Sequence, residues 1–362
     1  MKLHHHTSPE PDPRLRGLEI GRTWDTQTRA AAKLYADFFA TLGITPQTVR
    51  AVAEQSHRSL RAWSPALAAE AEGWAEGAGL ETWELGVVTA RTEILVAAPK
   101  KAGSHECSTA VYAPAAAGNP QTMQTWDWHQ HLTPEGLLLQ VTPREGWITK
   151  TFTEFGTPGK IGVNNQGLGL HFNILSHASD NSSGGVPVHA VARRILDEAA
   201  TVEEATAIAS SAVVSASTVF TVFTAGTGSS TSARAASLEV SPAGTAVVHP
   251  GDDGWLLHTN HFLDPALAEA DTIDHDALSP ERLAHLEQVR SSLEGRGATE
   301  RARQFCSAAG ESSVVCFHPD ASAAPHEQWQ TLLTIGVDVA AGTLEYAAAN
   351  PAQAARTGFQ TF

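Results

Sequence analysis

Cysteine is scarce in this chain of 362 residues, which contains only Cys107, Cys306 and Cys316. Three thiols cannot all pair, and their spacing excludes the dense disulfide framework of small secreted proteins. Cys306 and Cys316 flank a glycine-containing turn and could meet across a hairpin. We expect them to be two reduced, buried thiols.

Long apolar runs are also absent. The first residues, Met1 to His6, lack the apolar core of a secretory signal. No stretch approaches the roughly 20 apolar residues that a membrane-spanning helix needs. Together with the scarcity of cysteine, this predicts a cytoplasmic protein with no membrane partner.

Basic residues are few. The chain has 24 Lys and Arg but 39 Asp and Glu, which gives a net charge of −15. Such a surface repels phosphate backbones and anionic lipids, so we expect no nucleic-acid partner and no membrane binding. Charged residues make up only 17% of the chain, which suits close-packed layers.

Helix-forming segments and strand-forming segments are grouped along the chain. Residues 17–98 are rich in helix formers at helical spacing, whereas short β-type runs separated by Gly, Pro and Asn begin at Cys107. Two helices are expected at 188–200 and 202–211, the second opened by a capping box of Thr201 and Glu204. This grouping predicts an α+β layered fold rather than alternating βαβ units. The expected strands cover 108–112, 122–126, 136–142, 147–152, 161–164, 167–173, 219–224, 235–240, 245–250, 255–260, 330–339 and 343–348, and a charged helix is expected at 280–293.

Cys107 is the candidate nucleophile. It lies where the polar stretch Gly103 to Glu106 meets the apolar run that begins at Ala110. A thiol at the first position of a strand, preceded by a scissile peptide bond, is what a self-cleaving enzyme with an N-terminal nucleophile requires. The alternative is that Cys107 is a small core hydrophobe, as lone cysteines commonly are.

Asp127 follows Cys107 by 20 residues, on the far side of a turn marked by Gly118 to Pro120. A hairpin of that length returns the second strand beside the first and brings Asp127 close to the thiol. The flanking Trp126 and Trp128 predict a partly buried carboxylate, which needs a cation or hydrogen-bond donors. A freed α-ammonium group would be such a partner. The alternative is a surface Asp on an aromatic edge.

Two asparagines are candidate oxyanion donors. Asn260 ends an apolar strand in the segment His258-Thr259-Asn260-His261-Phe262, and Asn173 ends the strand after the turn at Asn164. His258 and His261 offer the alternative of a metal site. Two histidines provide too few ligands for one, so no metal and no cofactor are expected.

The segments around Cys107, Thr125 to Trp128, Gly162 to Gly169 and His258 to Phe262 together resemble the self-processing cysteine acyltransferases of the penicillin-biosynthetic type. These enzymes are related to penicillin V acylases and bile-salt hydrolases. The likeness extends from Arg16-Gly17 to Gly342 and therefore covers most of the chain.

This resemblance implies a four-layer αββα sandwich of the N-terminal nucleophile hydrolase type. It implies self-cleavage between Glu106 and Cys107 into a helical N-terminal segment, 1–106, and a catalytic core, 107–362. Cys107 matches the nucleophile and Asp127 the neighbouring acid. Asn260 matches the oxyanion donor, and Asn173 a second amide of the wider superfamily. The N-terminal fragment would remain a partner of the core after cleavage.

Two positions depart from the family pattern. Glu106 precedes the nucleophile where the penicillin-making members carry Gly, which affects the rate of self-cleavage. No Arg stands at 327–330, where one is expected near their active site, so binding of a penicillin-like carboxylate is not expected.

The predicted reaction is hydrolysis of a small amide, such as a β-alanyl or other aminoacyl amine, through a thioester on Cys107. Trp126, Trp128 and Trp255 suggest an apolar or aromatic portion in the substrate. One alternative is acyl transfer from an amide or thioester to an amine. The other is an unprocessed, catalytically silent binding protein on the same scaffold.

Overall fold

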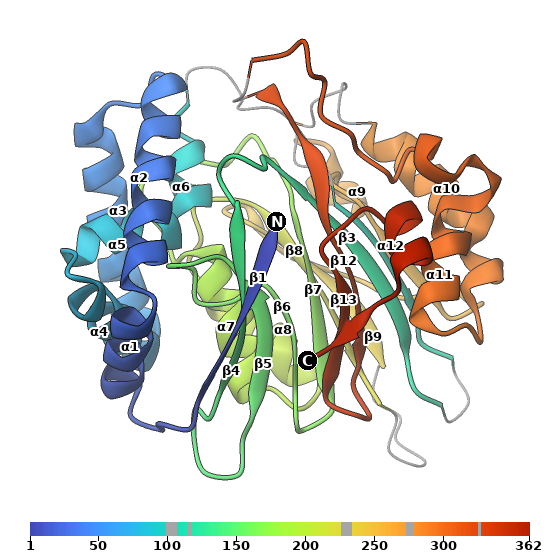
Figure 1. Ribbon diagram of the computed structural model, residues 1–362, viewed down its shortest axis with the longest axis horizontal. Coiled ribbons are helices and arrows are strands. Elements are labelled where there is room, and N and C mark those ends of the chain that lie inside the picture. The colour runs from blue at the N-terminus through green and yellow to red at the C-terminus, as the bar shows by residue number, and fades with distance from the viewer. Residues whose placement is uncertain (99–106, 115–117, 226–233, 273–277, 325–326) are drawn as a thin grey trace.

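The computed structural model describes residues 1–98, 107–114, 118–225, 234–272, 278–324 and 327–362. Its β-structure forms an eight-stranded sheet and a six-stranded sheet (Figure 1). In spatial order the larger sheet contains β1 (Lys2–Ser8), β4 (Glu135–Val141), β5 (Thr149–Thr153), β6 (Ile161–Asn164), β7 (Leu168–Ile174), β8 (Thr218–Thr224), β9 (Ala235–Ser241) and β10 (Gly244–Val248). The smaller contains β11 (Trp255–His258), β2 (Ser108–Tyr112), β3 (Gln121–Trp128), β12 (Gln330–Asp338), β13 (Thr343–Ala347) and β14 (Gln360–Thr361).

The helices form the outer layers. On one side of the molecule lie α1 (Pro13–Thr23), α2 (Asp25–Thr41), α3 (Pro46–Trp63), α4 (Pro65–Ala78), α5 (Thr82–Thr89) and α6 (Arg91–Leu95), and on the other α10 (Ser279–Leu293), α11 (Ala298–Cys306) and α12 (Pro351–Thr357) (Figure 1). The remaining helices are α7 (Val188–Glu198), α8 (Val202–Ser211), the short α9 (Pro265–Ala268) and a 3-10 turn at Ser307–Ser312. Each helix of the described residues is too short or too polar to cross a lipid bilayer.

The alternation of buried side chains along the strands explains the layers. Leu137, Leu139 and Val141 of β4 pack against the N-terminal helices, whereas Leu138 joins the core between the two sheets. Since α7 and α8 pack on the larger sheet and α10 and α11 on the smaller one, the order of layers is helix, sheet, sheet, helix. The predicted αββα sandwich is therefore confirmed.

Strand β1 is not predicted by the sequence analysis. It pairs in parallel with β4 from Lys2 to Ser8. Its histidines make specific contacts, because His4 Nε2 lies 2.8 Å from Glu135 Oε1 and His5 Nε2 lies 2.8 Å from the Tyr346 hydroxyl. The N-terminal segment thus contributes a strand to the same sheet as the core, in addition to its helices.

Helices α1 and α4 pack backbone to backbone because both carry glycine at the contact. A Cβ atom on Gly17 would lie 2.0 Å from the Glu70 carbonyl oxygen, and one on Gly73 would lie 2.1 Å from the Arg14 carbonyl oxygen. Those atoms belong to rigid helical backbone, so the helices would have to separate.

We expect Gly17→Ala to lower the free energy of unfolding by about 1–3 kcal/mol or more, the usual cost of overpacking. Chemical denaturation followed by circular dichroism measures this loss. Gly297→Ala is the matched control, because a Cβ at Gly297 meets no atom within 4 Å. Equal stability of the two variants would contradict the backbone contact.

Candidate active site

Cys107 lies directly before β2, which pairs antiparallel with β3 and places Ser108 opposite Thr125. This register brings Cys107 to the end of β3 where Trp126 and Asp127 lie. The hairpin expected from the 20-residue spacing therefore forms, and Cys107 and Asp127 line one cavity. Glu106, and with it the predicted cleavage bond, lies outside the described residues.

Both backbone groups of Cys107 are held by side chains from other elements. Its N–H donates to Asn260 Oδ1 at 2.7 Å. Its carbonyl oxygen accepts from Arg282 Nη1 at 2.7 Å and from Asn173 Nδ2 at 3.1 Å. The two predicted asparagines therefore meet at the candidate nucleophile, together with an arginine.

The orientation of Asn260 differs from the expectation. The atom that faces Cys107 also accepts from Arg282 Nη2 at 3.0 Å. Because both partners are donors, this atom must be the carbonyl oxygen. The Asn260 Nδ2 group donates to the Ile174 carbonyl at 2.8 Å, which leaves its second hydrogen for another acceptor.

Asp127 is 1% exposed, and neither carboxylate oxygen has a hydrogen bond of acceptable geometry to the described residues. Burial raises the pKa of Asp127 to about 7, moderated by the nearby Thr331 hydroxyl and the Arg282 guanidinium. Burial, and then the negative charge of Asp127, raises the pKa of the Cys107 thiol to about 12. In the intact chain this thiol is therefore protonated at neutral pH and needs a base.

The cavity beside Cys107 is small, at about 10 Å³, which is room for about one water molecule. Trp126 and Trp128 line it as expected, joined by Phe172 and Ile174. Trp255, also expected near the site, lies elsewhere. Its strand register places it opposite Tyr112, at the other end of β2, where the two rings stack at 5.0 Å.

Two buried cations also line the cavity. Lys160 Nζ lies 2.5 Å from Glu154 Oε2, and Arg91 Nη2 lies 2.9 Å from the same oxygen. All three side chains are at most 2% exposed. Burial lowers the pKa of Lys160 to about 7, although Glu154 opposes this shift.

His258 serves the loop that carries Asn260. Its Nε2 lies 2.8 Å from Glu239 Oε1, and its Nδ1 lies 3.0 Å from the Thr259 carbonyl. Both ring nitrogens therefore contact oxygen atoms of neighbouring residues, and neither faces an open metal site. Glu239 is on β9 and His258 on β11, so the pair joins the two sheets next to Asn260. Within the described ranges, no group of three or more His, Cys, Asp or Glu side chains is arranged to hold a metal.

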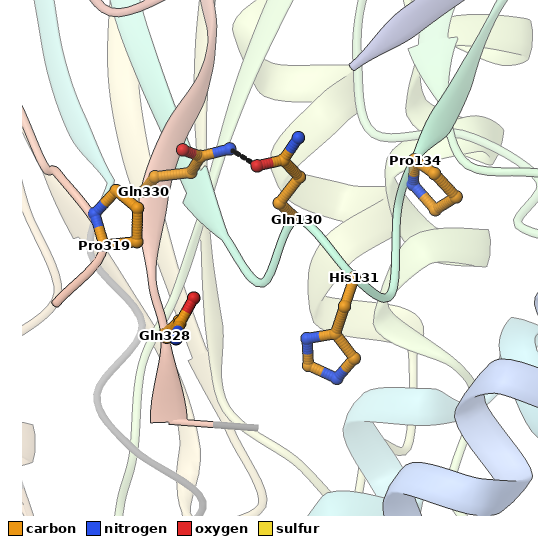
Figure 2. Close-up of a pocket in the computed structure, with 6 residues that line it drawn as sticks. All are labelled: Gln130, His131, Pro134, Pro319, Gln328 and Gln330. Carbon is orange, nitrogen blue, oxygen red and sulfur yellow. Dashed lines mark hydrogen bonds between the residues drawn. The ribbon is translucent and has the colours of Figure 1, made fainter. Parts of the chain in front are cut away.

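A larger pocket of about 310 Å³ lies beyond the end of β3. In Figure 2, Gln328, Gln330 and Pro319 lie on one side and His131 and Pro134 on the other. A hydrogen bond of 2.5 Å joins Gln330 to Gln130 across it. Since Gln330 pairs with Trp128 and the next residue, Thr331, with Asp127, the pocket lies at the same end of the sheet as Cys107.

Arg282, Arg91, Lys160 and Glu154 are not found by the sequence analysis. The sequence analysis found no Arg at 327–330, and the structure shows that an arginine reaches Cys107 from another element, since Arg282 of α10 contacts its carbonyl oxygen. Arg282 had a detectable signal, because a cation in the first turn of a helix opposes the helix dipole. Lys160 and Glu154 carry no comparable signal, since their pairing is formed only by the fold.

Asp127→Asn tests the environment of this carboxyl, and the Cys107→Ala background keeps the chain intact. Because the folded-state pKa of about 7 lies above the ordinary value of 3.8, the folded chain binds more protons between those values. Its stability therefore falls as pH rises through that window, by on the order of 4 kcal/mol. The Asn variant lacks this loss.

We expect Asp127→Asn to gain stability relative to its parent as pH rises from 4 to 8. Thermal unfolding at both pH values measures the difference, and Asp252→Asn at an exposed turn is the control. A gain that is the same at both pH values would contradict the elevated pKa.

Comparison with known proteins shows which family the chain matches. Residues 117–353 match the sequence profile of the family described as acyl-coenzyme A:6-aminopenicillanic acid acyl-transferase. The chain is 28% identical over 218 residues to the 40 kDa form of acyl-coenzyme A:6-aminopenicillanic-acid-acyltransferase from Emericella nidulans. That alignment covers 59% of this chain and spans 57% of the length of the relative.

Two solved structures are similar to this chain at lower sequence identity. The Caenorhabditis elegans ortholog of N-acylethanolamine-hydrolyzing acid amidase has a TM-score of 0.46 and 12% identity, covering 64% of this chain and 93% of its own. Penicillin V acylase from Agrobacterium tumefaciens has a TM-score of 0.40 and 15% identity, covering 67% of this chain and 83% of its own.

Proposed function

This chain belongs to the acyl-coenzyme A:6-aminopenicillanic acid acyl-transferase family, and from that premise we propose that it is a self-cleaving cysteine enzyme acting on a small amide. The observation that carries the proposal is the set of contacts to Cys107. Its backbone is held by Asn260, Asn173 and Arg282, and its side chain shares a cavity with Asp127.

The first step is self-cleavage. The Cys107 thiol attacks the carbonyl carbon of Glu106, and the acyl group moves from the Cys107 nitrogen to its sulfur. Water then hydrolyses this thioester, leaving a carboxylate on Glu106 and a free amine on Cys107. Arg282 and Asn173 hold the Cys107 carbonyl in place during the reaction.

The second step uses that free amine. Its ordinary pKa of about 7.7–8.0 lets it accept the thiol proton, so one residue supplies both nucleophile and base. The resulting ammonium is a partner for the buried Asp127 carboxylate. It also lowers the thiol pKa from its high value in the intact chain, because a nearby positive charge favours the thiolate.

Turnover then proceeds through a thioester. The thiolate forms a bond to the substrate carbonyl carbon, and the amine leaves with the proton held on the Cys107 nitrogen. The remaining Asn260 N–H stabilises the oxyanion. Water releases the acid in hydrolysis, or an acceptor amine takes the acyl group in transfer.

The N-terminal fragment, residues 1–106, stays bound after cleavage. Buried ion pairs cross the proposed cut, including Arg193 Nη1 to Glu70 Oε1 at 2.8 Å and Arg91 Nη2 to Glu154 Oε2 at 2.9 Å. Separation would expose charges that now pair in the interior, and strand β1 would leave its sheet. Size exclusion without denaturant is expected to give one species.

The pocket beyond Trp128 is suited to the amine part of the substrate. Its lining of glutamines, prolines and one histidine contains no Lys or Arg. This supports a neutral amine with hydrogen-bonding groups and disfavours the carboxylate of a penicillin nucleus.

A panel of amides with different acyl and amine parts tests the function. Release of free amine from at least one of them, abolished by alkylation of Cys107, is the expected result. If adding a second amine raises the rate, acyl transfer is the main reaction. An intact chain without turnover on any amide would instead identify a silent binding protein.

A further inference from the structure

We propose that the cavity beside Cys107 selects an acyl group whose far end carries a carboxylate. This inference rests on the proposed function, since it assigns the acyl half of the same site. The substrate would be the monoamide of a short dicarboxylic acid, such as a succinyl or glutaryl amide.

The first observation is an imbalance of charge. Lys160 and Arg91 both pair with a single carboxylate oxygen of Glu154, at 2.5 and 2.9 Å. The other oxygen of Glu154 accepts from the Tyr35 hydroxyl and from Thr133 Oγ1. Two buried cations therefore hydrogen-bond to one anion, and burying the second cation without its own partner is costly. Glu93 also attracts Arg91, but burial raises the pKa of Glu93 to about 7 and so weakens its negative charge at neutral pH.

The second observation is a pair of unsatisfied donors. Arg91 is 1% exposed, and its Nε and Nη1 atoms have no hydrogen-bond partner in the described structure. Buried donors in native proteins are nearly always paired, so these two N–H donors of Arg91 call for an acceptor. A carboxylate is the acceptor that a guanidinium binds most strongly, because its two oxygens match two parallel N–H groups.

The aromatic walls place these cations along the acyl path. Lys160 Nζ lies 3.9 Å from the centroid of the Trp126 ring, and the Arg91 guanidinium lies 4.4 Å from that of Trp128. A methylene chain extending from the Cys107 thioester would pack against these rings and bring its terminal group to the cations.

The same charges disfavour the β-alanyl group expected from the sequence. Its ammonium would face Lys160 and Arg91, with only Asp127 to offset them among the residues that line the cavity. The small volume of the cavity, about 10 Å³, also limits the length of the acyl group. It holds about one water molecule, so any acyl group must enlarge it, and short diacids require the least change.

The charge state of Lys160 adds a second readout. Burial lowers the pKa of this ammonium to about 7, and a bound anion would raise it again. Binding of glutarate at pH 8 should therefore take up protons. Calorimetry in buffers of different ionisation enthalpy detects this uptake.

The test compares glutaryl, 4-carbamoylbutanoyl, 4-aminobutanoyl and pentanoyl 4-nitroanilides on the mature two-fragment enzyme. We expect kcat/KM for the glutaryl substrate to exceed that of the uncharged amide by about 10-fold or more, the effect of a charged hydrogen bond. In the Lys160→Met variant the two values of kcat/KM should become nearly equal, mainly because KM for the glutaryl substrate rises. Lys150→Met, a half-buried lysine on β5, is the matched control and should keep the ratio.

The variant is designed to fold, because removing Lys160 leaves Arg91 and Glu154 as a balanced pair. Protection of Cys107 from iodoacetamide by free glutarate provides a measurement without turnover. Equal rates for all four substrates, or no protection by glutarate, would overturn the inference while leaving the enzyme active. Loss of both Cys107 alkylation and all amide turnover would point to failure of the proposed function itself.

Discussion

Replacing Cys107 by Ala is expected to abolish both self-cleavage and amide turnover. The variant lacks the only atom proposed to attack a carbonyl, in the precursor and in the mature enzyme alike. Loss of a covalent nucleophile can lower turnover by on the order of 10⁶-fold. A denaturing gel should show one full-length band of 38.3 kDa, and amine release should fall to background.

Cys306→Ala is the matched control for this variant. Cys306 is also buried, and its sulfur lies 3.3 Å from that of Cys316 in the outer core of the smaller sheet. We expect Cys306→Ala to be cleaved and active. Cleavage of the Cys107→Ala chain at the same bond would show that another group performs the attack.

Asn260→Asp is expected to reduce kcat by about 10²–10³-fold, the usual effect of losing an oxyanion donor. The substitution keeps an oxygen to accept from the Cys107 nitrogen and from Arg282, as Asn260 Oδ1 does now. It removes the amide N–H groups, including the one bonded to the Ile174 carbonyl, and adds a negative charge beside Arg282. Because the contact to the Cys107 nitrogen is kept, the experiment tests the N–H groups apart from that contact.

Steady-state kinetics on the mature protein measure this effect, with Asn165→Asp in the exposed turn before β7 as the control. A kcat within a few-fold of wild type would show that Asn260 acts only by holding Cys107. In that case the oxyanion donor would have to be another group in the cavity.

Local patterns predicted much of the fold. The capping box of Thr201 and Glu204 forms at the start of α8. Most core strands lie within a few residues of their expected positions. These elements depend on side-chain periodicity and turn residues close in sequence, which a single chain reveals.

Elements that depend on distant partners were missed. Strand β1 has little intrinsic strand signal, and it forms because β4, more than 100 residues later, offers an edge in parallel register. Cys306 and Cys316 are buried free thiols as expected, and they also lie close together, but Cys306 ends helix α11 rather than a hairpin strand. Their approach therefore comes from helix packing.

The candidate site shows the same division. The spacing of Cys107 and Asp127 predicted their hairpin because Cys107 directly precedes β2 and Asp127 lies on the neighbouring strand β3. Arg282, Lys160 and Arg91 come from segments whose contact with that hairpin exists only in the folded layers. Their charges, which set the electrostatics of the cavity, could not be assigned from one sequence.

Mass spectrometry of the purified wild-type protein under denaturing conditions tests the central claim most directly. We predict two polypeptides whose masses place the break between Glu106 and Cys107, with a free, alkylatable thiol on the first residue of the larger one. A single uncut chain that nevertheless hydrolyses amides would contradict the pairing of thiol and α-amine in one residue.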